Sequence, residues 1–141
     1  MTTNRGIRTA LSAIALTMGG AAMVSANESQ SALTLPASEF VPMQRYAVTY
    51  EEPVEMAKFY VRQLDLPVRE AQFEEGRSPY IPNHKVVIAT VDGIENPTVK
   101  AIQWRIELKA DGNAWEAVAA GLRRMCQNGP NTDTWTTDTC P

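Results

Sequence analysis

The chain is poor in the residues from which most metal and catalytic sites are built. Its 141 residues include one histidine, His84, and two cysteines, Cys126 and Cys140. These are too few for a zinc site of the usual Cys/His kind, and the pattern of a calcium-binding loop is absent. The 13 basic and 16 acidic residues give a net charge of −3, which argues against a dedicated nucleic-acid-binding protein. We therefore expect no metal, no cofactor and no nucleic acid as a partner.

Long apolar runs are also scarce, and the one that stands out lies at the start of the chain. Residues 1–26 contain Arg5 and Arg8, then an apolar run over residues 10–22, then small residues at the end. This order is typical of a cleaved signal peptide, the alternative being an N-terminal membrane anchor. The run is too short for a transmembrane helix, and no second long run follows it. We expect an exported protein, periplasmic or secreted, with no membrane span after signal removal.

The two cysteines fit that compartment, since both fall within the last 16 residues. In an oxidising environment a lone pair is most simply a structural disulfide between Cys126 and Cys140. The alternative is a redox-active pair, but such cysteines are usually close in sequence, as in Cys-x-x-Cys. The wide spacing therefore favours a disulfide that closes the C-terminal tail.

Apolar periodicity predicts strands and two amphipathic helices. Residues 43–50 and 98–109 alternate between apolar and polar side chains, and residues 85–91 form a β-rich apolar run. A first helix opens at Pro53 and ends before Pro67. A second helix is predicted from Asn113, which can cap it, to a stop at Gly129-Pro130.

The expected fold class is α+β: a two-layer domain with an antiparallel sheet of four to five strands and two amphipathic helices packed on one face. Residues 27–40 are polar and small, and we expect them to be a flexible lead-in. Residues 41–141 would then form a single domain with a disulfide-closed tail.

The end of the chain carries a resemblance. Arg124-Met125-Cys126, Trp135 and Cys140-Pro141 resemble the C-terminus of small uncharacterised exported proteins of proteobacteria with a Cys…Trp…Cys-Pro disulfide loop. The resemblance implies export and the disulfide, and it implies no reaction. The order of strands and helices is also similar to ferredoxin-like α+β domains, a fold that hosts many unrelated functions.

Any histidine-dependent catalysis would have to use His84, which stands where a loop meets a strand. No nucleophile motif surrounds a serine. The neighbouring pairs Glu51-Glu52 and Glu74-Glu75 are explained by helix capping and by a solvated loop. A surface histidine is the default interpretation of His84, and a small hydrolase using His84 with a carboxylate is the alternative.

Partner contacts are expected from two loops and one strand face. Tyr80 and Ile81 lie in a Pro-flanked loop, and Gln103 and Arg105 fall on the polar, open face of the strand at residues 98–109. Trp135 lies between the cysteines, where it either shields the disulfide or contacts a partner. The partner would be an envelope protein or a small ligand.

These observations together predict a small, exported, non-catalytic binding or accessory module of the bacterial envelope. Two alternatives stay open: the hydrolase that uses His84, and a structural homo-oligomeric envelope protein.

Overall fold

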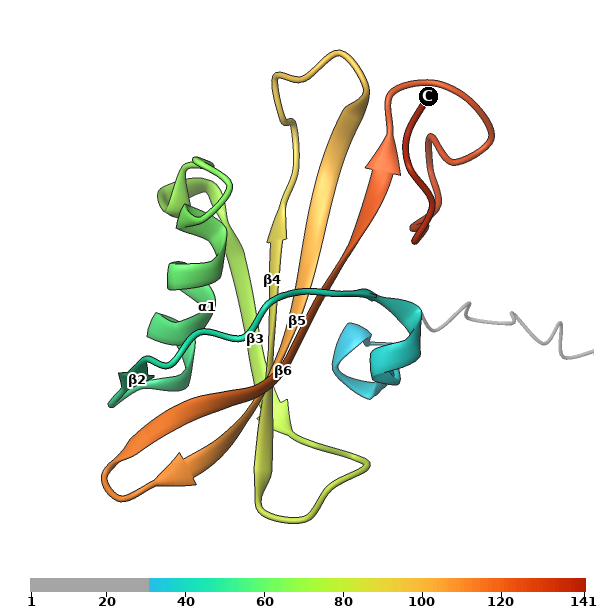
Figure 1. Ribbon diagram of the computed structural model, residues 1–141. Coiled ribbons are helices and arrows are strands. Elements are labelled where there is room, and N and C mark those ends of the chain that lie inside the picture. The colour runs from blue at the N-terminus through green and yellow to red at the C-terminus, as the bar shows by residue number, and fades with distance from the viewer. Residues whose placement is uncertain (1–30) are drawn as a thin grey trace, which may run out of the picture.

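The structure, a computed structural model, describes residues 31–141 and is dominated by one antiparallel sheet (Figure 1). Two 3-10 turns, η1 (Ala32–Thr34) and η2 (Ala37–Glu39), come first. The other elements in chain order are β1 (Val41–Pro42), β2 (Thr49–Tyr50), α1 (Pro53–Arg62), the 3-10 turn η3 (Val68–Glu70), β3 (Gln72–Arg77), β4 (His84–Val91), β5 (Val99–Asp111) and β6 (Ala114–Cys126). The signal peptide predicted for residues 1–26 lies outside the described residues.

The sheet has six strands, and its order is β1-β6-β5-β4-β3, with β2 also paired to β6. All strand pairs are antiparallel. The two long strands β5 and β6 form the centre of the sheet, and Val118 is an extra residue in β6 at a register shift opposite Glu107 and Leu108. Such a bulge increases local twist, and the β5–β6 hairpin curls away from the rest of the sheet beyond it (Figure 1).

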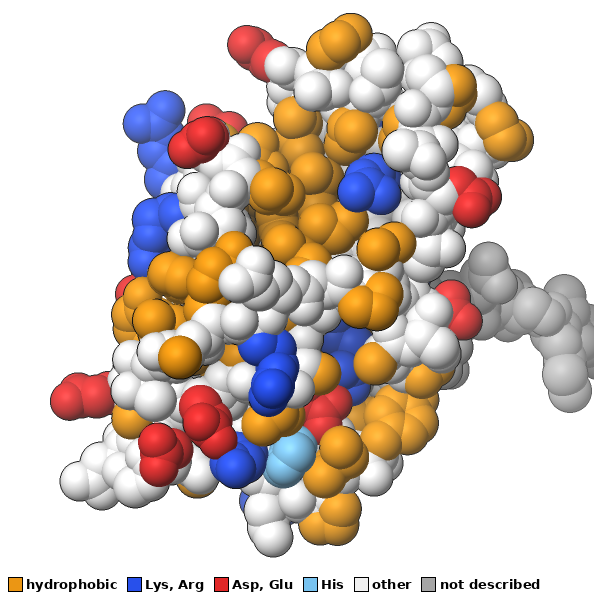
Figure 2. All heavy atoms as spheres, viewed as in Figure 1, with side chains coloured by type: hydrophobic (Ala, Val, Ile, Leu, Met, Phe, Trp, Pro, Cys, Tyr) orange, Lys and Arg blue, Asp and Glu red, His pale blue; other side chains and the backbone are white. Residues whose placement is uncertain are grey.

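Helix α1 covers one face of the sheet. Pro53 supplies a first turn with its backbone dihedral already set, and Glu55 and Arg62 complement the helix dipole at the two ends. The apolar stripe of the helix meets alternate side chains of the strands, and all of these residues are buried: Met56, Ala57, Tyr60, Val61, Val87, Ala89, Val91, Ile102, Trp104, Ile106 and Leu108. Beyond the helix, partly buried side chains such as Tyr46, Leu66 and Ile94 pack against this core. Hydrophobic side chains also gather at the surface there (Figure 2).

The opposite face is covered by the segment that precedes β2. Residues 31–40, expected as a lead-in, contain η1 and η2 and pack Leu33, Leu35 and Phe40 against Val86 and Ile88. The chain then pairs with β6 through β1 and crosses that edge of the sheet to reach β2 and α1 (Figure 1). We call residues 31–42 the N-terminal strap, because they close the second face of the sheet.

The expected fold class is wrong in one main respect. Residues 31–141 contain one helix of seven or more residues and six strands, not two helices on four to five strands. The segment predicted as a second helix is strand β6 (Ala114–Cys126), paired along its whole length with β5. The similarity to ferredoxin-like domains, which rested on the same order of elements, falls with it.

Local sequence explains this error. Gly112 has φ +60 and is the first of two residues between the paired Asp111 and Ala114. A two-residue Gly-Asn connection is a hairpin turn, because glycine readily adopts the positive φ that such a turn needs. The alanine-rich stretch after it has a high helix propensity. Its 13 residues instead form a strand, whose backbone groups make hydrogen bonds to β5 in the sheet.

A disulfide joins Cys126 and Cys140, as predicted. It ties the tail to the end of β6, where Arg124 and Thr136 exchange backbone hydrogen bonds of 2.9 and 2.8 Å. Lys100 also donates to the carbonyl oxygen of Thr132 at 2.6 Å. The tail is therefore fixed to the edge of the sheet by both covalent and hydrogen bonds.

Candidate functional site

Three polar side chains of β5 lie on the strap-covered face of the sheet. The alternation of the strand places Gln103, Arg105 and Glu107 on this face, because the intervening apolar residues point to α1. Their exposed fractions are 6%, 2% and 4%. Buried charges are costly unless they are paired and hydrogen-bonded, so the contacts of these groups are the first question.

The Glu107 carboxylate is shared between a histidine and an arginine. Its Oε1 lies 2.9 Å from His84 Nδ1, and its Oε2 accepts a 3.0 Å hydrogen bond from Arg105 Nη1. Arg105 Nε donates in turn to the carbonyl oxygen of Leu35 in the N-terminal strap, at 3.1 Å. This chain of contacts connects the strap to His84.

The same contacts orient the imidazole ring. A carboxylate only accepts hydrogen bonds, so Nδ1 of His84 carries the proton that points to Glu107. Nε2 is left to face other groups, and the His84 side chain keeps 19% of its surface exposed. A histidine held by one nitrogen with the other accessible can bind a ligand or move a proton.

A second set of polar contacts continues across the same face. Gln103 donates to Thr90 Oγ1 at 3.0 Å and accepts from Arg123 Nε at 2.8 Å. The Arg123 guanidinium lies 5.0 Å from the ring centroid of Phe40 and 5.2 Å from that of Trp135. Burial lowers the pKa of Arg123, and the nearby Glu39 carboxylate opposes that shift. This set holds the strap and the C-terminal tail against β6.

His84 opens onto a cavity of about 520 Å³ at the end of the β3–β4 hairpin. Figure 2 shows the pale-blue imidazole of the only histidine at the surface, with both basic and acidic side chains near it. We call this the hairpin cavity, and its lining residues are Arg77, Ser78, Pro82, Asn83, His84, Lys85 and Trp115. Its volume falls in the range of small-molecule sites.

The hairpin loop that forms this cavity is held by hydrogen bonds. Ser78 N donates to the carbonyl oxygen of His84 at 2.9 Å, and Ser78 Oγ accepts from the backbone of Tyr80 and Ile81. Asn83 adopts φ +64, a conformation that asparagine tolerates better than most residues. The cavity is therefore bordered by a turn with a defined shape.

The charged side chains that line the hairpin cavity are basic. No acidic residue lines it, whereas Arg77 and Lys85 do. Lys85 Nζ lies 2.6 Å from Glu75 Oε1 and 4.9 Å from the centroid of the Trp115 ring. Within residues 31–141, Arg77 forms no ion pair. A negatively charged group would find an unpaired cation here, and the indole offers an apolar wall beside it.

The predicted contact residues do not come together on one surface. Tyr80 and Ile81 are exposed in the hairpin loop, at 55% and 44%, and the Tyr80 hydroxyl donates to the carbonyl oxygen of Thr34 in the strap at 2.7 Å. Gln103 and Arg105 are buried, so the sheet face expected to be open is covered by the strap. Trp135 is half-buried against Arg123, away from the hairpin loop.

Sequence reasoning missed the partnership of His84 and Glu107. It proposed a carboxylate as the partner of His84 in a hydrolase without naming the residue, and the acid pairs that it named, Glu51-Glu52 and Glu74-Glu75, are neighbours in sequence. Glu107 lies 23 residues from His84, on the neighbouring strand. The signal was present in the alternation of residues 98–109, which puts Glu107 and Arg105 on the face opposite Ile106. Pairing that strand with residues 85–91 brings its polar face beside His84.

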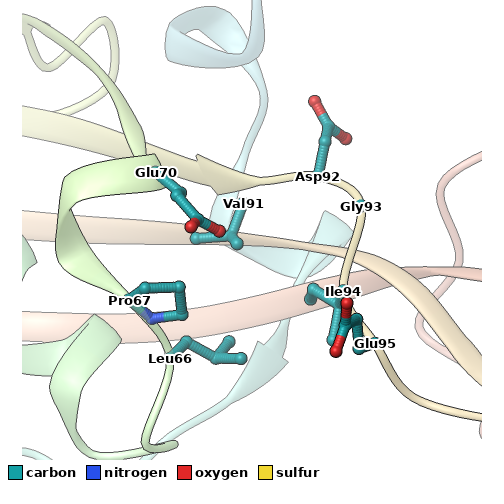
Figure 3. A pocket seen from close by; sticks show the side chains of 8 residues that line it. All are labelled: Leu66, Pro67, Glu70, Val91, Asp92, Gly93, Ile94 and Glu95. Carbon is teal, nitrogen blue, oxygen red and sulfur yellow. The ribbon is translucent and has the colours of Figure 1, made fainter.

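A further cavity, of about 370 Å³, lies between η3 and the turn after β4. Leu66, Val91 and Ile94 supply its apolar part (Figure 3). Its three carboxylates do not converge: Glu70 points toward Val91, Asp92 points away, and Glu95 lies beside Ile94 (Figure 3). Across the described residues no group of three or more His, Cys, Asp or Glu side chains is placed to hold a metal ion.

Comparisons with known protein families, with curated proteins and with solved structures find no match for this chain. Among the described residues, no helix combines the length and apolar character that crossing a membrane requires. The function must therefore be argued from the hairpin cavity and the polar groups behind it.

Proposed function

We propose that the protein is an exported, non-catalytic binding module of the bacterial envelope and that its hairpin cavity binds a small anionic ligand. The observation that carries this proposal is the sign of the charged residues that line the cavity: Arg77 and Lys85 do, and no carboxylate does. The disulfide between Cys126 and Cys140 is compatible with the oxidising compartment that export implies.

The cavity suits an anionic oxygen group attached to a flat or apolar body. Arg77 can donate two parallel hydrogen bonds to a carboxylate or phosphate group, and Lys85 adds a point charge. The Trp115 ring can pack against the body of the ligand. His84 Nε2 contributes a further polar group, and its orientation is maintained by the buried Glu107.

Trp115 makes binding measurable. Inorganic phosphate, sulfate and a set of aromatic carboxylates would be titrated into the protein while tryptophan fluorescence is recorded. We expect a saturable change for at least one of them. The change should weaken with added salt, because the interaction is between charges at a partly exposed site.

Arg77→Gln should weaken that binding by about tenfold, which corresponds to roughly 1.4 kcal/mol. Arg69→Gln is the matched control, because it removes the same charge from an exposed side chain on η3 whose only ion pair within residues 31–141 is with Glu70. Equal effects of the two substitutions would mean that only overall charge matters, and the proposal would then fail.

A second candidate function is a small hydrolase, and the His84–Glu107 contact favours it. A histidine held at Nδ1 by a carboxylate can act at Nε2 as a general base toward water. Ser78 is a poor nucleophile in this arrangement, because its Oγ already accepts two backbone N–H groups. Hydrolysis of activated esters that disappears in His84→Gln, while thermal unfolding shows that the variant is still folded, would favour this candidate. Equal rates for the two proteins would exclude it.

A further inference from the structure

The loop between β3 and β4 carries two apolar side chains at its tip. Within residues 31–141 the exposed large hydrophobic side chains are Leu64, Tyr80 and Ile81, and the last two are neighbours in this loop. Neither of these two belongs to the hydrophobic clusters on the two faces of the sheet, so core packing does not account for them. The loop projects beyond the strands at one end of the molecule (Figure 1). Hydrophobic side chains lie beside the pale-blue imidazole at that end (Figure 2).

The backbone of this tip has no N–H group without an acceptor. Pro79 and Pro82 carry no backbone N–H. The N–H groups of Tyr80 and Ile81 both donate to Ser78 Oγ, at 3.4 and 3.2 Å. An unsatisfied backbone donor makes transfer from water to an apolar medium costly, and these four residues avoid that cost. The tip is therefore suited to an environment that is poorer in water than an ordinary loop requires.

Basic side chains lie directly behind the apolar tip. Arg77 and Lys85 line the hairpin cavity together with Pro82 of the loop, so the cavity adjoins the tip. Lys85 is paired with Glu75, whereas Arg77 has no ion pair within residues 31–141. A free guanidinium beside an apolar projection is complementary to a surface with an anionic layer above an apolar one.

We propose that the hairpin cavity binds the phosphate headgroup of an anionic phospholipid at a bilayer surface, and that Tyr80 and Ile81 enter the layer beneath the headgroups. The assignment rests on the proposed function, since it names the source of the anion. Arg77 can donate two parallel hydrogen bonds to a phosphate group. Tyrosine is enriched at membrane interfaces, and here its hydroxyl already donates to the carbonyl oxygen of Thr34 at 2.7 Å.

Binding of this kind should be weak and reversible. The two side chains of the tip bury little apolar area, and the Glu75 carboxylate offsets the charge of Lys85. Peripheral attachment generally needs two signals, and here these are the apolar tip and the charge of Arg77. Loss of either signal should therefore weaken binding to the bilayer.

Flotation of the purified protein with lipid vesicles tests the proposal. Vesicles of phosphatidylglycerol and phosphatidylcholine in equal parts should carry the protein with them, vesicles of phosphatidylcholine alone should not, and added salt should weaken the binding. Inorganic phosphate is titrated separately while tryptophan fluorescence is recorded. If phosphate binds and the phosphatidylglycerol vesicles do not, the lipid assignment fails and the proposed function stands. If neither binds, both fail.

Ile81→Ser tests the contribution of the apolar tip. It should weaken vesicle binding by about fivefold, because part of an isoleucine side chain no longer leaves water. Binding of inorganic phosphate should be unchanged, because Ile81 does not line the hairpin cavity. Leu64→Ser is the matched control, since Leu64 follows α1 and is exposed to a similar extent, 40% against 44%. Equal losses in the two variants, both shown by thermal unfolding to be folded, would overturn the proposal.

Two further variants test the headgroup contact and the insertion. Arg77→Gln should weaken binding to the phosphatidylglycerol vesicles by about fivefold, and Arg69→Gln should not. Ile81→Trp places a fluorophore at the tip, and lipids brominated on their acyl chains should quench its emission more strongly than that of the wild-type protein. Equal effects of the two arginine substitutions, or vesicle binding without this additional quenching, would overturn the proposal.

Discussion

Phe40 packs directly onto the backbone at Gly121. A Cβ atom added at Gly121 would lie 2.8 Å from Cβ of Phe40 and 3.0 Å from the carbonyl oxygen of Val41. Both of these atoms belong to the strap, and neither is the end of a flexible side chain. The absence of a side chain at Gly121 therefore lets the strap pair with β6 and close the second face of the sheet.

Gly121→Ala should displace the strap. We expect the free energy of unfolding to fall by about 1–3 kcal/mol, as in other overpacked sites, and limited proteolysis within residues 31–42 to become faster. Urea denaturation and mass spectrometry of the cleavage products would measure the two effects.

Gly76→Ala is the matched control for that substitution. A Cβ at Gly76 would lie 3.2 Å from Cδ1 of Leu33, also in the strap, but that atom ends a side chain that can move. Its effect should stay below about 1 kcal/mol, since alanine also reduces the entropy of the unfolded chain. If the two alanine variants are equally stable, close packing at Gly121 does not hold the strap.

Part of this architecture could be predicted from the sequence, because some elements are determined by the pattern of apolar residues within their own segment. In the helix at Pro53 and in the strands over residues 85–91 and 98–109, the spacing of the apolar residues predicts the element, because these residues lie on its buried face. Strand β6 was predicted as a helix, because its alanines are compatible with the period of a helix and with that of a strand. Only the Gly112-Asn113 turn and the pairing with β5 decide between helix and strand.

The candidate site was harder to predict than the fold. Its central contact joins His84 and Glu107 across two strands, so it depends on the register of β4 against β5. The burial of Arg105 depends on the strap, whose polar and small residues indicate flexibility when considered alone. In both cases the deciding contact is made by residues far apart in sequence.

Glu107→Gln should destabilise the protein by about 3 kcal/mol, because it leaves the buried Arg105 cation without a carboxylate. The free energy of unfolding would be measured in urea at neutral pH. The double variant Arg105→Met/Glu107→Gln should lose less than the single variant, because no buried charge is then left uncompensated.

Glu116→Gln serves as the comparison for Glu107→Gln. Glu116 pairs with Lys109 at 2.9 Å, but both side chains are well exposed, at 37% and 51%. An exposed pair of this kind contributes about 0–1 kcal/mol. Similar losses at positions 107 and 116 would show that burial adds nothing to the Glu107 ion pairs.

The ionisation of Tyr60 makes the free energy of unfolding depend on pH in the alkaline range. Its side chain is fully buried, and its hydroxyl donates to the carbonyl oxygen of Gln44 at 3.2 Å. Burial raises its pKa above the ordinary value of 10.0. At a pH between 10.0, the pKa of Tyr60 in the unfolded chain, and the higher pKa of Tyr60 in the folded protein, the unfolded chain loses the phenolic proton while the folded protein keeps it. The contribution of Tyr60 to the free energy of unfolding is therefore fully present below pH 10 and is lost as the pH rises further.

Tyr60→Phe isolates this effect. The variant should lose about 1 kcal/mol at neutral pH through the missing hydrogen bond. As the pH rises above 10, the stability of the wild-type protein should fall faster than that of the variant, so their difference narrows. Urea denaturation at several pH values would measure both curves. Parallel curves throughout would contradict the raised pKa of Tyr60.

The disulfide should account for a large share of the stability of the tail and of β6. Cys126 and Cys140 are 14 residues apart, and closing a loop of about this length contributes roughly 3 kcal/mol in the chain-entropy model. The double variant Cys126→Ala/Cys140→Ala should lose about that amount in urea denaturation. Treatment with a reducing agent should destabilise the wild-type protein by a similar amount and leave the variant unaffected.

Because Trp135 packs on Arg123 only while the tail is held to β6, tryptophan fluorescence should report loosening of the tail before global unfolding. An unchanged midpoint after confirmed reduction would show that the hydrogen bonds between Arg124 and Thr136 hold the tail without the covalent link.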